Sequence, residues 1–165
     1  MILKNLNKSL LINALLTSFI FLLDRISKIY VINLDKKLLG SEIFSSKFLN
    51  IYLVWNEGIA FGLFSFDHAS MYNFLTIFIV IIILFIFLML KQSEGLKRYS
   101  LIMILGGAIG NVFDRIIYKG VPDFIDFHIN NFHWFIFNIA DIFITIGVIF
   151  MISLEFMNIN NKKKS

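Results

Sequence analysis

The sequence predicts an all-α integral membrane protein with four transmembrane helices and a β-containing external loop between helices 1 and 2. Of its 165 residues, 58% are hydrophobic, and the mean hydropathy of +0.81 is far above that of a soluble domain. The apolar runs are close to the roughly 20 residues that cross a bilayer as a helix. They do not alternate with polar residues, which excludes a membrane β-barrel. We expect one domain over residues 1–165.

The first span is expected at about 10–32. Lys4 and Lys8 followed by an apolar run resemble a secretory signal, but the run continues into Asp24, Arg25 and Lys28 instead of a small-residue cleavage site. We therefore interpret it as a retained helix. The other spans are expected at about 74–90, 99–118 and 134–154. The second of the four contains no charged residue and is the least ambiguous.

Two external loops are expected, at 35–70 and 119–133. The first contains a β-prone run over 48–55, and its length and aromatic content indicate an ordered, functional segment. Four spans place both termini on one side of the membrane. The positive-inside rule makes that side cytoplasmic, because most basic residues lie with the termini: Lys4, Lys8, Lys91, Lys97, Arg98, Lys162, Lys163 and Lys164. The polar ends of spans one, three and four then meet at the external face.

Composition excludes several other classes of protein. The chain has no cysteine, so disulfides, a thiol peptidase and a thiolate metal site are ruled out. Its net charge of +4 comes from basic residues scattered around the spans, which suits anionic lipid and membrane topology better than nucleic acid.

Polar residues within the first and third spans are expected to pair inside the protein. Asp24 and Lys28 stand at i and i+4, and we interpret them first as a structural ion pair. In the third span, Asn111, Asp114 and Arg115 fall along one side of the helix, where they can satisfy one another. Gly106 and Gly110 form a small-xxx-small face in the same span, which allows another helix to pack closely.

The external loop contains the run Asn56-Glu57-Gly58-Ile59-Ala60-Phe61-Gly62. Alone, it is an ordinary turn whose glycines suit positive φ. The alternative is an apolar surface, formed with the neighbouring Phe and Trp residues, that grips a substrate.

Asp123 and Asp141 are the strongest candidates for chemistry, because ionised carboxylates at a membrane edge are costly and usually functional. Pro122 presets the backbone before Asp123, and Asn138 lies three residues before Asp141 on the same helical face. Two carboxyls close together share one proton, so one serves as acid and the other as base, as in aspartic peptidases. An ion or proton relay and a purely structural role remain as alternatives.

A metal site is the weaker interpretation of the segment between these aspartates. His128 and His133 lack a recognised metal spacing and are expected in a hydrated loop, and Asp126 is expected to be solvated or in a turn. His68 carries no signal. We therefore expect no metal and no organic cofactor.

Taken together, the motifs closely resemble those of the lipoprotein signal peptidases, also called type II signal peptidases. The resemblance covers nearly the whole chain and rests on Asp24 with Lys28, Asn56 to Phe61, Gly106 to Arg115, Val121 to Phe127, and Phe137 to Asp141. Two positions depart from the family pattern: Pro122 replaces an aliphatic residue, and Ile142 replaces a small one. Both affect local fit and leave the carboxylates in place.

The resemblance implies a bacterial inner-membrane aspartic endopeptidase, inhibited by globomycin, that cleaves prolipoproteins before a diacylglyceryl-modified cysteine. It places the catalytic dyad at Asp123 and Asp141. Substrate or dyad support would come from Asn56, Gly58, Asn111, Asp114, Arg115, Asn138, Asp24 and Lys28. The expected partners are these prolipoproteins and membrane lipid, and the expected state is a monomer. The alternatives are a small proton-coupled transporter, which lack of repeat halves disfavours, and a non-enzymatic assembly factor.

Overall fold

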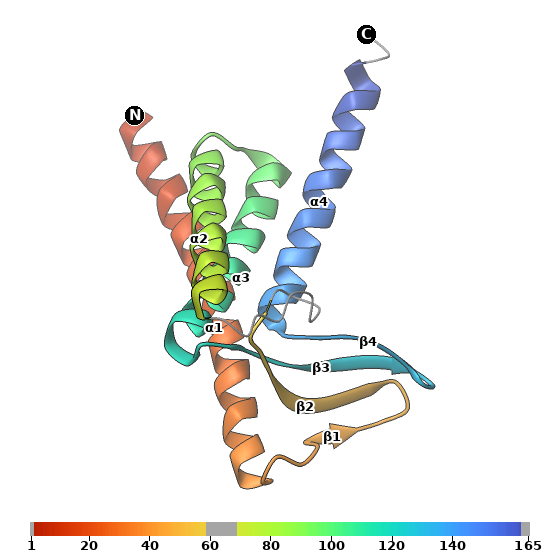
Figure 1. The fold of residues 1–165 in the computed structure, drawn as a ribbon. Coiled ribbons are helices and arrows are strands. Elements are labelled where there is room, and N and C mark those ends of the chain that lie inside the picture. The colour runs from red at the N-terminus through yellow and green to blue at the C-terminus, as the bar shows by residue number, and fades with distance from the viewer. Residues whose placement is uncertain (1, 59–68, 163–165) are drawn as a thin grey trace.

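Four long helices and one four-stranded sheet make up the computed structural model, which describes residues 2–58 and 69–162 (Figure 1). The helices are α1 (Ile2–Lys37), α2 (Ala69–Lys91), α3 (Gly95–Tyr118) and α4 (Ile139–Lys162). The strands are β1 (Phe44–Ser45), β2 (Leu49–Asn56), β3 (Val121–Ile129) and β4 (Phe132–Phe137).

All four helices are long and apolar enough to cross a membrane, over Ser9–Lys37, Tyr72–Lys91, Gly95–Tyr118 and Ile139–Met157. This confirms the predicted fold class. Two predicted boundaries need correction. The first helix is longer than expected and continues to Lys37, because its polar turn around Asp24 is buried within the protein. The fourth span begins at Ile139, since residues 134–137 belong to β4.

The sheet is antiparallel, in the order β1-β2-β3-β4. β2 confirms the β-prone run predicted in the first loop. The expectation that residues 119–133 form a loop without regular structure is wrong, because most of this segment belongs to the β3–β4 hairpin. A two-residue turn joins these strands between the paired residues Ile129 and Phe132, and Asn130 has a φ of 53° there. Asparagine tolerates this left-handed conformation, which two-residue hairpin turns require.

Helix α3 is the centre of the bundle and contacts the other three helices. A buried cluster on α1, α2 and α3 includes Ile20, Ile86, Leu101 and Leu105. Most large apolar side chains of α2 face outward, as a lipid-facing helix requires.

The glycines of α3 bring its neighbours very close, as predicted for Gly106 and Gly110. A Cβ atom on Gly106 would lie 2.8 Å from the Ile20 side chain, and one on Gly110 would lie 2.6 Å from the Asp24 carboxylate. On the side facing α4, a Cβ atom on Gly107 would lie 2.5 Å from the Ala140 carbonyl oxygen. The glycines of α3 therefore leave room for the Ile20 and Asp24 side chains of α1 and for the backbone of α4 at Ala140.

The first and last described residues of the chain lie at the opposite end of the molecule from the sheet (Figure 1). The start of α1 and the end of α4 are at one end of the bundle, and the sheet extends sideways from the other end. α1 continues past the bundle beside the sheet, where it contacts β2 and β3. The polar residues of α1, α3 and α4 meet where the bundle joins the sheet.

Candidate active site

Asp123 lies in strand β3, and not in a loop as the sequence had suggested. Its side chain is almost fully buried. The amide of Asn56, on the neighbouring strand β2, donates a 2.9 Å hydrogen bond to Oδ2. The amide of Asn138 donates a 2.6 Å hydrogen bond to Oδ1. The β2 strand has a bulge between Ile51 and Val54, next to the residue that pairs with Asp123. Such bulges commonly re-aim side chains beside active sites.

Asp141 lies in the first turn of α4, where a capping box fixes it. The Asp141 N–H donates to Oδ1 of Asn138 at 3.1 Å, and the Asn138 N–H donates to Oδ2 of Asp141 at 3.1 Å. The amide of Asn111, on α3, donates a 2.8 Å hydrogen bond to Asp141 Oδ1. The positive end of the helix dipole also favours an ionised carboxylate at this position.

Asn138 therefore joins the two aspartates. Its backbone N–H and side-chain oxygen engage Asp141, and its side-chain amide reaches Asp123. The same amide also lies 3.2 Å from Oδ1 of Asn111, which links all four residues into one network. Asn56, Asn111 and Asn138 thus all contact one or both carboxylates, and their role as support for a dyad stays a prediction.

The electrostatic environment separates Asp123 from an ordinary aspartate. Burial, followed by the negative charge of Asp141, raises the pKa of Asp123 from 3.8 to about 7. The amide hydrogen bonds from Asn56 and Asn138 oppose this rise without cancelling it. Asp123 therefore carries a proton in a substantial fraction of molecules near neutral pH.

A charged cluster lies beside this network, where α1 packs against α3. Lys28 is fully buried, and its Nζ donates to Asp24 at 2.9 Å, Asp114 at 2.7 Å and Asn111 Oδ1 at 2.8 Å. Arg25 donates a further 2.7 Å hydrogen bond to Asp114. Two cations and two carboxylates thus balance, as buried charges require. By accepting from Lys28, the Asn111 oxygen is fixed, and its N–H group is left to face Asp141.

The cluster confirms the predicted pairing of Asp24 with Lys28. Asp24 also accepts a 3.0 Å hydrogen bond from the Ala140 N–H, a buried donor in the first turn of α4 that has no partner within its own helix. The expectation that Asp114 and Arg115 satisfy one another is wrong, because helix geometry sends them to different partners. Asp114 pairs with α1, whereas Arg115 donates to the carbonyl oxygen of Gly58.

Gly58 and Asn56 are held in place together beside Asp123. The Gly58 N–H donates to Oδ1 of Asn56 at 3.0 Å, leaving the Asn56 amide directed at Asp123. Arg115 anchors Gly58 from α3 and lies over the ring of Tyr72 at 5.5 Å. The remainder of the predicted loop motif, residues 59–62, lies outside the described residues, as does His68.

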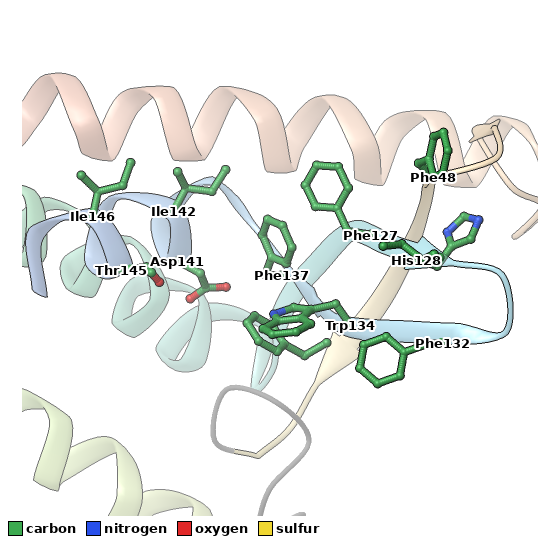
Figure 2. Close-up of a pocket in the computed structure, with 12 residues that line it drawn as sticks. Phe48, Phe127, His128, Phe132, Trp134, Phe137, Asp141, Ile142, Thr145 and Ile146 are labelled. Atoms are coloured by element: carbon green, nitrogen blue, oxygen red, sulfur yellow. The ribbon is translucent and has the colours of Figure 1, made fainter. Parts of the chain in front are cut away.

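A cavity of about 610 Å³ opens beside Asp141 (Figure 2). Asp141, Ile142 and Thr145 of α4 lie at one end of it, and the aromatic side chains of the β3–β4 hairpin extend to the other. The wall is almost entirely apolar and includes Phe48, Phe127, Phe132, Trp134, Phe137 and Ile146. An apolar ligand in this cavity would lie against one of the two carboxylates.

The expectation for Asp126 is wrong, since its side chain is completely buried. Its Oδ2 lies 2.8 Å from Nδ1 of His133, within hydrogen-bond distance. The rings of His128 and His133 stack, with their centroids 4.9 Å apart. His133 is half exposed, so the predicted hydration holds for that residue alone. The residues lie on paired strands, which the sequence analysis did not predict.

Two further features were missed from the sequence. Arg25 was assigned no role, although it sits beside Asp24 inside an otherwise apolar run, where an unpaired cation would be costly. The aromatic wall on β4 was missed because residues 134–137 were assigned to the fourth span. Asn130-Asn131, between two runs with aromatic and β-branched residues, was the available signal for a hairpin.

Comparisons with known proteins agree with one another. Residues 16–157 match the family model described as signal peptidase (SPase) II. A lipoprotein signal peptidase of Pelagibacter ubique is 47% identical over 94% of this chain and 93% of its own length. One from Anaplasma marginale is 35% identical over 91% of this chain and 87% of its own.

A solved bacterial membrane enzyme, determined by the in meso method at 2.3 Å resolution, has a similar fold. The two superpose with a TM-score of 0.75 at 30% sequence identity, covering 93% of this chain and 92% of that one.

Proposed function

The chain belongs to the signal peptidase II family, and from this premise we propose that it is an aspartic endopeptidase that removes signal peptides from prolipoproteins. We place the cleavage at the peptide bond before the diacylglyceryl-modified cysteine, as the family resemblance implies. The observation that carries the proposal is the pair Asp123 and Asp141, joined through Asn138 beside an apolar cavity.

In the resting site, Asp123 holds the proton that the two carboxylates share. Its pKa of about 7 supports this assignment, as does the position of Asp141 in a helix N-terminal turn that favours negative charge. Asp141 is then the general base and Asp123 the general acid. The side-chain donors to the two carboxyl groups are the neutral amides of Asn56, Asn111 and Asn138, so no cation among the described residues pairs directly with either aspartate.

The reaction proceeds in two proton-balanced steps. Asp141 takes a proton from a water molecule, whose oxygen bonds to the scissile carbonyl carbon while Asp123 donates its proton to the carbonyl oxygen. In the second step the C–N bond breaks, Asp141 gives its proton to the leaving nitrogen, and Asp123 recovers a proton from the collapsing hydroxyl group. The site returns to its initial protonation state, and no metal or cofactor takes part.

The cavity supplies a site for the lipid on the substrate cysteine. Its aromatic and aliphatic wall suits acyl chains, and Asp141 at one end places a carboxylate beside the lipid-bearing residue. We expect globomycin to inhibit by occupying the same region, as the family resemblance implies. The protein is expected to act as a monomer.

We place both termini in the cytoplasm and the site at the external face of the bacterial inner membrane. The basic residues near the termini and in the turn between α2 and α3 support this orientation. The sheet then lies on the side from which a translocated prolipoprotein arrives.

The proposal is tested by incubating purified protein with a lipid-modified prolipoprotein and following its shift in mobility. We expect cleavage by the parent, and a loss of about 10²–10⁴-fold in Asp123→Asn and in Asp141→Asn, since each removes one proton-transfer group. Glu155→Gln removes an exposed carboxylate elsewhere on α4 and serves as the matched control.

Cleavage that survives in both aspartate variants would exclude the dyad. Activity in detergent, where no proton gradient exists, would also separate the peptidase from a proton-coupled transporter that uses the same carboxylates.

A further inference from the structure

Three side chains with metal-binding groups meet on the β3–β4 hairpin. Asp126 and His128 lie two residues apart on β3, and His133 of β4 is the cross-strand partner of His128. One donor atom from each of the three lies within 4.8 Å of the others. Figure 2 shows His128 at the hairpin end of the cavity, away from Asp141. The proposed peptide cleavage uses none of these residues.

The cluster also contains an unsatisfied nitrogen. Nδ1 of His128 is buried and has no hydrogen-bond partner among residues 2–58 and 69–162, whereas the Asp126 carboxylate contacts His133 and interacts with the Tyr52 side chain. Asp126 is fully buried, so its carboxylate requires compensating partners. An ordinary carboxylate–histidine pair would account for the contact between Asp126 and His133, but not for the orphan nitrogen of His128.

We propose that Asp126, His128 and His133 form a binding site for a divalent transition metal such as Zn²⁺. Two imidazoles and one carboxylate are typical zinc ligands, whereas Mg²⁺ and Ca²⁺ prefer oxygen ligands alone. Three protein ligands leave one tetrahedral position for water. The inference is independent of the proposed peptidase reaction.

The observed distances suit this coordination. Zinc–nitrogen and zinc–oxygen bonds of about 2.0–2.1 Å place neighbouring tetrahedral ligand atoms roughly 3.3 Å apart. Asp126 Oδ2 lies 2.8 Å from His133 Nδ1 and 4.0 Å from His128 Nδ1, so the two separations bracket that value. Small rotations of the two imidazole rings out of their stack bring all three donors to one ion.

A metal at this position would cross-link β3 to β4. Asp123 lies three residues before Asp126 on β3, and β4 leads directly into Asn138. The ion would therefore stiffen the hairpin that connects the two carboxylates. We assign the ion no part in the proposed cleavage, because His128 and Asp141 line opposite ends of the cavity.

The test measures Zn²⁺ binding to the full chain in detergent by calorimetry, after purification with a tag that contains no histidine. We expect one ion per chain. His128→Phe and His133→Phe keep an aromatic ring, and each should weaken binding by more than about 100-fold, beyond the loss seen when only an outer-shell partner is removed. His68→Ala removes the chain's other histidine and should bind like the parent.

Hydrogen exchange provides the second readout. Zn²⁺ should slow amide exchange in β3 and β4 of the parent and of His68→Ala, with no such effect in His133→Phe. Equal affinity in the parent and in the variant carrying both phenylalanines would overturn the proposal. So would loss of binding in His68→Ala.

Discussion

Asn56→Leu is expected to move the alkaline limit of cleavage to higher pH. The Asn56 amide donates a hydrogen bond to Oδ2 of Asp123, and such a donor favours the ionised carboxylate. Removing it disfavours ionisation, so the pKa of Asp123 rises. If Asp123 must be protonated to act as the acid, activity in the variant persists to higher pH even when its maximum rate is lower.

The size of the shift follows from the strength of that hydrogen bond. A hydrogen bond to a charged group contributes about 1.5–3 kcal/mol, and one pKa unit corresponds to about 1.36 kcal/mol. The limit should therefore rise by roughly one to two units, from about 7 in the parent. At pH 9 the parent should keep about one hundredth of its plateau kcat/KM, and the variant about a tenth to a half of its own.

The assay follows cleavage of a fluorogenic lipopeptide in mixed micelles, with kcat/KM measured from pH 5 to 9.5, a range of roughly two units on each side of the expected limit. Asn50→Leu is the matched control, because Asn50 lies on the same strand and its side chain contacts Ser45 and the backbone of Ser46, away from Asp123. Its alkaline limit should coincide with that of the parent.

A limit that stays in place in Asn56→Leu, or that moves to lower pH, would refute the assignment of Asp123 as the acid. A parent profile without an alkaline limit near pH 7 would do the same.

The charge cluster and the membrane orientation give two more predictions. Lys28→Met leaves two buried carboxylates with one cation and should lower the free energy of unfolding in micelles by about 3–5 kcal/mol. Adding Asp114→Asn restores the balance and should recover part of that loss; equal stability of the single and double variants would contradict it. For orientation, Ser41→Cys should react with an impermeant thiol reagent from outside the cell, and Gln92→Cys should be protected. The chain has no native cysteine, so the reverse pattern would place the site on the cytoplasmic side.

Sequence reasoning predicted the parts of the fold that depend on local composition. A charge-free run such as 74–90 has no alternative to a spanning helix, and α2 contains it. The two candidate carboxylates could also be identified from the sequence, because an aspartate at a membrane edge stands out against apolar neighbours. The spacing of Asn138 and Asp141 even contained the capping box that begins α4.

Contacts between residues far apart in the chain could not be predicted from the sequence. Nothing local indicates that Asp114 pairs with Arg25 and Lys28, 89 and 86 residues earlier in the chain. The β3–β4 hairpin was missed because its second strand is apolar and runs almost directly into α4. A short apolar run has the same composition in a buried strand and in a helix, and only the pairing of β4 with β3 distinguishes them.

The capping box of α4 also bears on when the protein becomes active. Asn138 can orient both aspartates only after α4 has started at Ile139, and that start rests on Asp24 of α1 through the Ala140 N–H. A nascent chain that has inserted three spans possesses Asp123, Asn111 and the charge cluster, but no second carboxylate. If Asp123 and Asp141 form the proposed dyad, that dyad is therefore complete only when the last span is in place.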